Sequence, residues 1–195
     1  MMEATANKRY TLSEYQQSEE ETGVRYEYHN GEVFAMSGGS PEHSAIVINV
    51  SDVLLGTLPA GCRRFNSDLK VYVPAVDKSF HPDLTVACRP IEKPDEINAI
   101  SNPILLVEVL SESTSAYDPV STAGGKKFWY FSQLPSLREY VLIEQDRWAV
   151  ETRYRESAES KWTMEYYEGA EAEVIFRSID LQTPIDRIYE DTEGL

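Results

Sequence analysis

The sequence predicts an α+β (mixed α/β) fold, in which an N-terminal helix and β-hairpin come first. The first indication is the order of elements along the chain: helix, hairpin, helix, strands, helix and further strands. The second is the apolar run at residues 104–110, which is typical of a strand buried on both faces of a sheet. The third is the length of 195 residues without a linker or repeat, which indicates one domain spanning residues 1–195.

The first expected elements are a helix and a hairpin. Thr11 and Glu14 match a capping box, which marks the start of a helix. Asn30 and Gly31 together are a strong signal for a two-residue hairpin turn between antiparallel strands. The expected elements are therefore a helix at residues 12–21 and strands at residues 24–29 and 32–37.

A second helix and several short strands should follow. Ser40 and Pro41 combine an N-cap residue with proline at the first helical position, which indicates a helix start. The helix should bury four apolar residues: Ile46, Val50, Val53 and Leu54. The expected elements are this helix, ending near residue 55, strands at 63–66, 69–73 and 82–87, and loops at 74–79 and 89–102.

The last half of the chain predicts a helix between strands. The central strand at residues 104–110 should end in a polar turn. The helix after it has a weakened first turn at Gly124 and Gly125, and Pro135 should end it. Aromatic and β-branched residues alternate further on, which favours strands. The expected elements are a helix at 120–133, strands at 139–144, 148–154, 162–167 and 174–176, and a helical turn at 185–189.

Composition limits the classes of function. Thirty-three acidic and eighteen basic residues give a formal charge of −15 and a pI near 4.6. This balance argues against tight non-specific binding of nucleic acid, but not against a local basic groove. The polar N-terminus and the lack of a long apolar run predict a soluble, cytoplasmic protein without a membrane span. Cys62 and Cys88 have no metal-type spacing and suggest no disulfide framework, which fits a reducing compartment.

Glu108 is an acid inside the apolar run, where a carboxylate needs a compensating partner. It is either an edge or ion-paired glutamate or a metal ligand, and its central place favours the metal ligand. Asp83 begins the preceding predicted strand, and two acids on neighbouring strands can converge on Mg²⁺, with Mn²⁺ as a substitute. Such an ion orients a phosphodiester and activates water. Lys127 shares a helical face with core residues and can supply a cation, with Lys126 as the alternative.

Six segments occur in a characteristic order: Tyr-Glu27, Gly-Gly-Ser-Pro-Glu-His43, Ser-Phe-His-Pro-Asp83, Leu-Val-Glu108-Val-Leu-Ser, Lys127-Phe and Pro135-Ser-Leu-Arg-Glu-Tyr-Val-Leu-Ile. Together they resemble the putative restriction endonuclease family within the PD-(D/E)XK nuclease superfamily, over nearly the whole chain. The resemblance implies a restriction-endonuclease-like core, which is a mixed central β-sheet flanked by helices. It also implies metal binding by Asp83, Glu108 and the carbonyl of Val109. The superfamily lysine two residues after the glutamate is replaced here by Leu110. The resemblance therefore implies that Lys127, from the following helix, stabilises the phosphate or positions the water.

Other candidates have two interpretations each. His43, near a helix N-terminus, is either a structural hydrogen-bonding group or a catalytic residue. Glu27 either faces solvent on the hairpin or assists the metal shell through water. Arg63 and Arg64 either contact phosphates or form solvated ion pairs. Five aromatic residues are expected in sheet packing or a subunit interface, with base stacking as the alternative: Trp148, Tyr154, Trp162, Tyr166 and Tyr167.

The sequence thus predicts a Mg²⁺-dependent endonuclease that hydrolyses phosphodiester bonds of nucleic acid, with DNA as the expected substrate, by metal-activated water. The aromatic strands predict a homodimer. One alternative is a non-catalytic homodimeric scaffold with a nuclease fold. Another is a metal-dependent hydrolase of a small phosphorylated substrate, which would need no basic groove.

Overall fold

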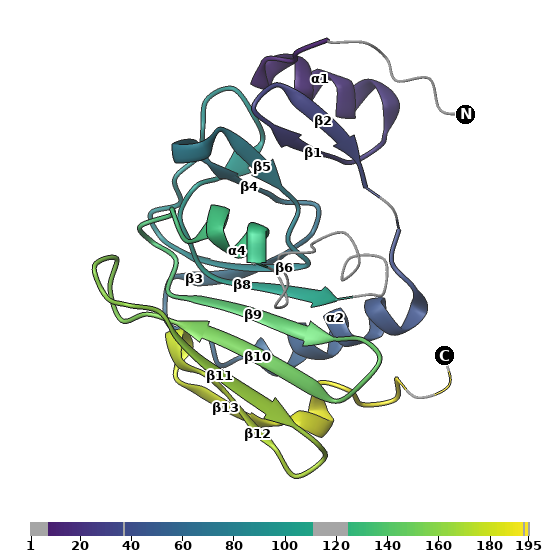
Figure 1. Ribbon diagram of the computed structural model, residues 1–195, viewed down its shortest axis with the longest axis vertical. Helices are drawn as coiled ribbons and strands as arrows, with labels where there is room; N and C mark the ends of the chain where they lie inside the picture. Colours follow the sequence, from purple (N-terminus) through teal and green to yellow (C-terminus); the bar gives the residue numbers. More distant parts are fainter. Residues whose placement is uncertain (1–7, 37, 111–124, 193, 195) are drawn as a thin grey trace.

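The computed structural model, shown in Figure 1, describes residues 8–36, 38–110, 125–192 and 194. A five-stranded sheet with α1 forms one end of the molecule, and a six-stranded sheet forms the middle and the other half. A two-stranded sheet, β12 (Glu173–Phe176) with β13 (Leu181–Pro184), lies beyond the larger sheet. The predicted mixed α+β class is confirmed.

The N-terminal helix and hairpin form as the sequence predicts. α1 (Leu12–Thr22) begins with the capping box and ends at Gly23, which has a φ of 67° that glycine adopts without steric cost. β1 (Tyr26–His29) and β2 (Glu32–Ala35) pair antiparallel. Both residues of the Asn30-Gly31 turn have positive φ, as this type of tight hairpin requires.

The smaller sheet has the strand order β2-β1-β5-β4-β7. Its other strands are β4 (Lys70–Val73), β5 (Lys78–Phe80) and β7 (Ala99–Ile100). The predicted loop at residues 74–79 is wrong in its last two residues, because β5 begins there after a 3-10 helix at Pro74–Val76. The predicted loop at residues 89–102 likewise contains β7. Strands of 3 and 2 residues are too short to show a period-2 pattern, so only their distant pairing partners define them.

The larger sheet has the strand order β11-β10-β9-β8-β6-β3. Its strands are β3 (Cys62–Asn66), β6 (Leu84–Cys88), β8 (Pro103–Leu110), β9 (Glu139–Glu144), β10 (Ala149–Tyr154) and β11 (Thr163–Glu168). β8 and β9 are parallel, and all the other neighbouring pairs are antiparallel. The predicted central strand β8 therefore lies between β6 and β9 in the interior of the sheet.

Alternate residues of β8 face two separate cores, because successive side chains of a strand point to opposite faces. Leu105 packs on the side of α2 (Pro41–Leu54), and Leu106 packs on the side of α4 (Gly125–Phe131). The α4 core also includes residues of β4 and β5, so α4 lies between the two sheets. Glu108 has the parity of Leu106 and therefore faces α4.

Three details differ from the sequence prediction or lie beyond it. The buried stripe of α2 is Ile46, Val50 and Leu54, at intervals of four residues, and Val53 is only partly buried at its border. Of the helix predicted at residues 120–133, the structure describes only the part that forms α4, Gly125–Phe131. Its predicted start and the polar turn before it fall within residues 111–124, outside the described residues. No helix in the described part of the chain has the length and apolar composition of a membrane span.

Cys62 and Cys88 form a disulfide, which corrects the expectation that they suggest no disulfide framework. The two residues lie directly opposite each other on the antiparallel strands β3 and β6. Their separation of 26 positions in the chain contains no information about this register. The pairing is therefore visible only once the strands are aligned.

Candidate active site

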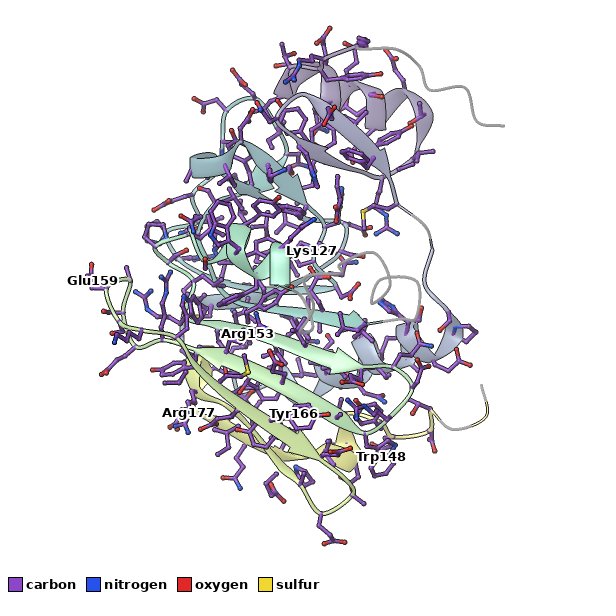
Figure 2. The ribbon with its side chains drawn as sticks, in the orientation of Figure 1. Lys127, Trp148, Arg153, Glu159, Tyr166 and Arg177 are labelled. Carbon is purple, nitrogen blue, oxygen red and sulfur yellow. A yellow bond between two sulfur atoms is a disulfide. The ribbon has the colours of Figure 1, made fainter. Side chains whose placement is uncertain are left out.

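Four charged side chains from four separate segments of the chain meet between the two sheets. Glu108 comes from β8, Lys127 from α4 and Glu27 from β1, while Asp83 lies just before β6. Leu84 pairs with Val107 across β6 and β8, so Asp83 lies beside Glu108 at the same level of the sheet. Figure 2 labels Lys127 on α4, in the middle of the molecule. The predicted convergence of these residues is thus present in the fold.

Lys127 connects the acids of the two sheets. Its Nζ is 3.2 Å from Glu108 Oε1 and donates a hydrogen bond to Oε2 at 3.3 Å. The same Nζ is 3.0 Å from Glu27 Oε1, on the smaller sheet. The amine also lies 5.8 Å from the centre of the Phe80 ring, which is buried under it. One ammonium group therefore pairs with two carboxylates, and the aromatic ring beneath limits the positions that it can take.

Asp83 is held by the backbone of β8 and by α2. The Val109 N–H donates a hydrogen bond to Asp83 Oδ2 at 2.8 Å, and His43 Nε2 lies 3.2 Å from the same oxygen. His43 occupies the first turn of α2, where Ser40 caps the His43 N–H. A Cβ added at Gly39 would lie 2.8 Å from His43 Nδ1, so glycine leaves room for the imidazole ring. His43 and Glu27 therefore both lie at the site, as candidates paired with Asp83 and Lys127 respectively.

Burial and neighbouring charge shift the pKa values of the central pair. Burial raises the pKa of Glu108 to about 7, and Asp83 and Glu27 add to this rise while Lys127 opposes it. For Lys127, burial alone would lower the pKa, but the carboxylates of Glu108 and Glu27 outweigh burial and raise it. Lys127 is therefore fully charged at neutral pH, whereas Glu108 is close to the balance between its two forms.

The two flanking groups are shifted toward their charged forms. Burial opposes the ionisation of Glu27, but hydrogen bonds from His29 and Lys127 outweigh it and lower the pKa to about 2. His29 Nε2 lies 3.3 Å from Glu27 Oε2. The hydrogen bond to Asp83 raises the pKa of His43, against the effect of burial. The site therefore consists of alternating carboxylates and cationic donors.

The donor set fits a hard divalent cation. Glu108 Oε1 is buried and has no hydrogen-bond partner among the described residues, although it lies within ion-pair distance of Lys127. Its oxygen and those of Asp83 are the ligands that Mg²⁺ prefers, and Mg²⁺ commonly needs only one or two protein carboxylates because it retains water. Among the described residues, no group of three or more His, Cys, Asp or Glu side chains is arranged to hold a metal. The fit is therefore to a two-carboxylate Mg²⁺ site rather than to a site enclosed by protein ligands.

The other candidates lie away from these residues. Arg63 and Arg64 are on the edge strand β3, two strands from Glu108. Trp148 stacks on Tyr189 with ring centres 5.7 Å apart. Trp162 packs edge-on against Phe128. Figure 2 labels Tyr166 on the far edge of the larger sheet, and its side chain is exposed.

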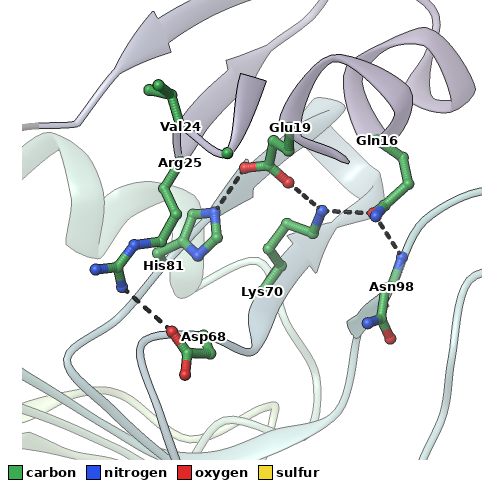
Figure 3. A pocket seen from close by; sticks show the side chains of 9 residues that line it. Gln16, Glu19, Val24, Arg25, Asp68, Lys70, His81 and Asn98 are labelled. Atoms are coloured by element: carbon green, nitrogen blue, oxygen red, sulfur yellow. Dashed lines mark hydrogen bonds and ion pairs between the residues drawn. The ribbon is translucent and has the colours of Figure 1, made fainter. Parts of the chain in front are cut away.

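A polar cluster around Glu19 of α1, which the sequence did not single out, is shown in Figure 3. Glu19 Oε1 accepts hydrogen bonds from His81 Nε2 at 3.1 Å and from the Tyr26 N–H at 3.0 Å, and Oε2 pairs with buried Lys70. The cluster lines a cavity of about 210 Å³. Tyr26 directly precedes Glu27, and His81 is two residues before Asp83. One carboxylate thus connects the backbone segments that carry two of the site acids.

We expect Glu19→Gln to destabilise the fold by about 3 kcal/mol at neutral pH, because it leaves buried Lys70 without its anion. Burial opposes the ionisation of Glu19, but hydrogen bonds from His81 and Lys70 hold its pKa at about 2, below the ordinary value of 4.5. A lowered folded-state pKa stabilises the protein above pH 4.5, and that contribution is lost as the pH falls toward 2. Urea unfolding measured across this range should show that the difference in the free energy of unfolding between wild type and variant becomes smaller as the pH falls.

The matched control is Glu20→Gln, on the exposed side of the same helix. It should change stability by less than about 0.5 kcal/mol. An equal loss in both variants, or a loss in Glu19→Gln that does not depend on pH, would contradict the assigned role of the cluster.

Comparisons with known proteins indicate a family and a fold. A family model described as Uma2, putative restriction endonuclease, matches residues 12–183. Two proteins of Synechocystis sp., named uncharacterized proteins slr1290 and sll1609, are 33% and 31% identical to this chain. Each match covers 90% of this chain, and the matches cover 89% and 97% of those proteins. The crystal structure of a putative nuclease belonging to DUF820, from Anabaena variabilis, matches 92% of this chain and 97% of its own with a TM-score of 0.64. Its sequence identity is 22%, so this last likeness is one of fold.

Proposed function

This chain belongs to the Uma2 putative restriction endonuclease family, and from that membership we propose that it is a metal-dependent endonuclease that hydrolyses phosphodiester bonds of DNA. The observation that supports the proposal most is the contact of Lys127 with Glu108, beside Asp83, between the two sheets. A chain that served only as a scaffold would gain nothing from burying a carboxylate whose Oε1 has no hydrogen-bond partner in the described part of the chain.

Asp83, Glu108 and the carbonyl of Val109 would hold Mg²⁺, or Mn²⁺ in its place. When bound, the ion would lower the pKa of a water molecule and stabilise negative charge on the phosphate. Lys127 would donate to a phosphate oxygen or to the attacking water, a role that Leu110 cannot fill. The ammonium group already lies within reach of both sheets, so little reorganisation would be needed.

His43 and Glu27 would act as positioning residues. His43 holds the Asp83 carboxylate toward the end of β8, and the Val109 N–H donates to the same Asp83 oxygen. Glu27 holds the Lys127 amine from the opposite sheet and is itself held by His29. Loss of either residue should leave cleavage possible but its reacting groups misaligned, so the cleavage rate should fall about 10- to 100-fold.

The decisive experiment is a cleavage assay on single- and double-stranded DNA and RNA with Mg²⁺, Mn²⁺ or EDTA. Metal-dependent appearance of internal cleavage products, absent in Asp83→Asn, is the expected result. The charge of −15 favours a small phosphorylated substrate as the second candidate. Phosphate release from nucleotides or sugar phosphates, without cleavage of any polynucleotide, would support that candidate and overturn the endonuclease proposal.

We also propose that the chain forms a homodimer through β11, the edge strand of the larger sheet. Met164 and Tyr166 lie on the same face of this strand and are 58% and 48% exposed. Exposed apolar side chains on an unpaired edge favour association with another copy. Light scattering should give twice the mass of the 22.2 kDa chain. The double substitution Met164→Glu with Tyr166→Glu should shift the particle to the single-chain mass.

The control for this test is Ile48→Glu on α2, because Ile48 is as exposed, at 59%, but lies on a helix away from the edge. It should leave the mass unchanged. A single-chain mass for the wild type at micromolar concentration would remove the dimer from the proposal.

A further inference from the structure

We propose that a row of aromatic rings beside the candidate active site stacks on the unpaired bases of single-stranded nucleic acid. The row consists of Phe34, His29, Phe80, Tyr130 and Trp129, and is called the aromatic row below. This inference rests on the proposed endonuclease function and specifies its substrate: a strand with exposed bases rather than an intact duplex.

The rings of the aromatic row are in continuous contact. The centre of the His29 ring is 5.0 Å from that of Phe34 and 6.3 Å from that of Tyr130. Tyr130 continues to Trp129, with ring centres 5.4 Å apart in an edge-on arrangement. Phe80 lies under the middle of the row, 5.2 Å from His29 and 5.8 Å from Tyr130, and is almost completely buried. The inner rings therefore fix the positions of the two outer ones.

The two ends of the row are open to solvent. Phe34 is 45% exposed and Trp129 is 54% exposed, whereas a large aromatic side chain in a core would be covered. One exposed aromatic residue alone is ordinary on a protein surface. Two exposed rings at opposite ends of one supported row form a platform of the kind on which successive bases stack.

The row is attached directly to the candidate active site. Phe34 lies opposite Glu27 in the hairpin, and residues paired in this way share a face of the sheet. His29 contacts Glu27 through its Nε2, at 3.3 Å. Tyr130 and Trp129 follow Lys127 on the short helix α4. A single strand of nucleic acid whose scissile phosphate contacts Lys127 would therefore have its neighbouring bases over these rings.

Charge favours a single strand over a duplex as the occupant. A chain with a formal charge of −15 is poorly suited to bind the dense phosphates of a duplex. Base stacking acts on the bases rather than on the phosphates, so it adds affinity for a strand whose bases are exposed and none for a duplex whose bases are paired. Lys78, whose Nζ is 4.5 Å from the centre of the Tyr130 ring, places one cation beside the row for a backbone phosphate. Stacking thus supplies affinity that the overall charge of the protein denies to duplex binding.

The test is binding of a fluorescein-labelled oligothymidylate, followed by fluorescence anisotropy at low ionic strength in EDTA, where no cleavage occurs. Phe34→Ala and Trp129→Ala should each weaken binding about tenfold, the typical effect of removing one stacking ring. Phe34→Trp and Trp129→Phe should retain most of the affinity, because each keeps an aromatic face. A labelled duplex of the same length should bind weakly and equally to all these proteins.

The matched control is Leu55→Ala, which removes an apolar side chain that is 63% exposed at the end of α2, on the opposite face of the larger sheet from α4. It should leave binding unchanged. Equal affinity of wild type and the Phe34→Ala, Trp129→Ala double variant overturns the aromatic row as a binding site, as does tighter binding of the duplex. These results do not depend on catalysis: cleavage with unchanged binding in the double variant refutes the row alone, and stacking-dependent binding without metal-dependent cleavage refutes the endonuclease alone.

Discussion

Lys127→Ala should fold and bind Mn²⁺, but its turnover in a nuclease assay should fall about 10²- to 10³-fold. The substitution removes a cationic donor from a partly dry site. Two carboxylates leave a divalent ion with almost no net positive charge, so a further cation is needed near the phosphate. Lys127 is the described side chain that contacts Glu108 and Glu27 together. Without it, the pKa of Glu108 should rise in the metal-free protein, so the carboxyl is protonated there and the fold tolerates the loss. Binding of Mn²⁺ would then displace this proton. Cleavage rates and calorimetric Mn²⁺ titration at about pH 8 provide the measurement.

The neighbouring Lys126 supplies the matched control, since its side chain is exposed on the same helix. Lys126→Ala should reduce turnover by no more than a few-fold. The reverse ranking would transfer the role to Lys126, and full activity in both variants would remove a lysine from the mechanism. Lys127→Arg, which keeps the charge but changes its shape, should fall between wild type and Lys127→Ala.

Local sequence signals predicted the elements whose ends are marked by specific residues. The capping box and Gly23 define α1, and the Asn30-Gly31 turn defines the hairpin. The short strands β5 and β7 have no such marks, because they are strands only through pairing with residues distant in the sequence. Register also explains the disulfide, which depends on the alignment of β3 with β6. Elements marked by residues close together in the sequence were thus predicted, whereas the short strands and the disulfide, which depend on the alignment of distant segments, were not.

The candidate site was predictable because one of its acids contradicts its surroundings. Glu108 lies in a run that is apolar apart from itself, so the sequence alone indicates that its charge must be compensated. The sequence favoured a metal ion over an ion pair as the compensating partner, and Lys127 over Lys126 as the further cation. Lys127 is the described lysine that contacts both Glu108 and Glu27. Glu19 was not foreseen, because it lies in an ordinary acidic helix whose partners come from β1, β4 and the segment before Asp83. Nothing within its own helix distinguishes it from Glu20.

Asp83→Asn should weaken the binding of Mn²⁺ more than about 100-fold and should reduce cleavage to background. The amide has nearly the shape of the carboxylate, and its oxygen can still accept from the Val109 N–H, as Asp83 Oδ2 does at 2.8 Å. What it loses is the negative charge that a hard cation requires. Calorimetric titration of Mn²⁺, with circular dichroism to check the fold, measures the effect directly.

The matched control is Asp68→Asn, which removes a carboxylate that is 77% exposed and pairs with Arg25 beside the α1 cluster. It should bind Mn²⁺ as the wild type does. If Asp83→Asn bound Mn²⁺ equally well, the cation site could not lie between β6 and β8, and Glu108 would be an ordinary buried partner of Lys127. If Asp83→Asn lost Mn²⁺ but kept full cleavage, the acids would hold a structural ion instead. Only the loss of both Mn²⁺ binding and cleavage is consistent with a metal that Asp83 and Glu108 share in catalysis.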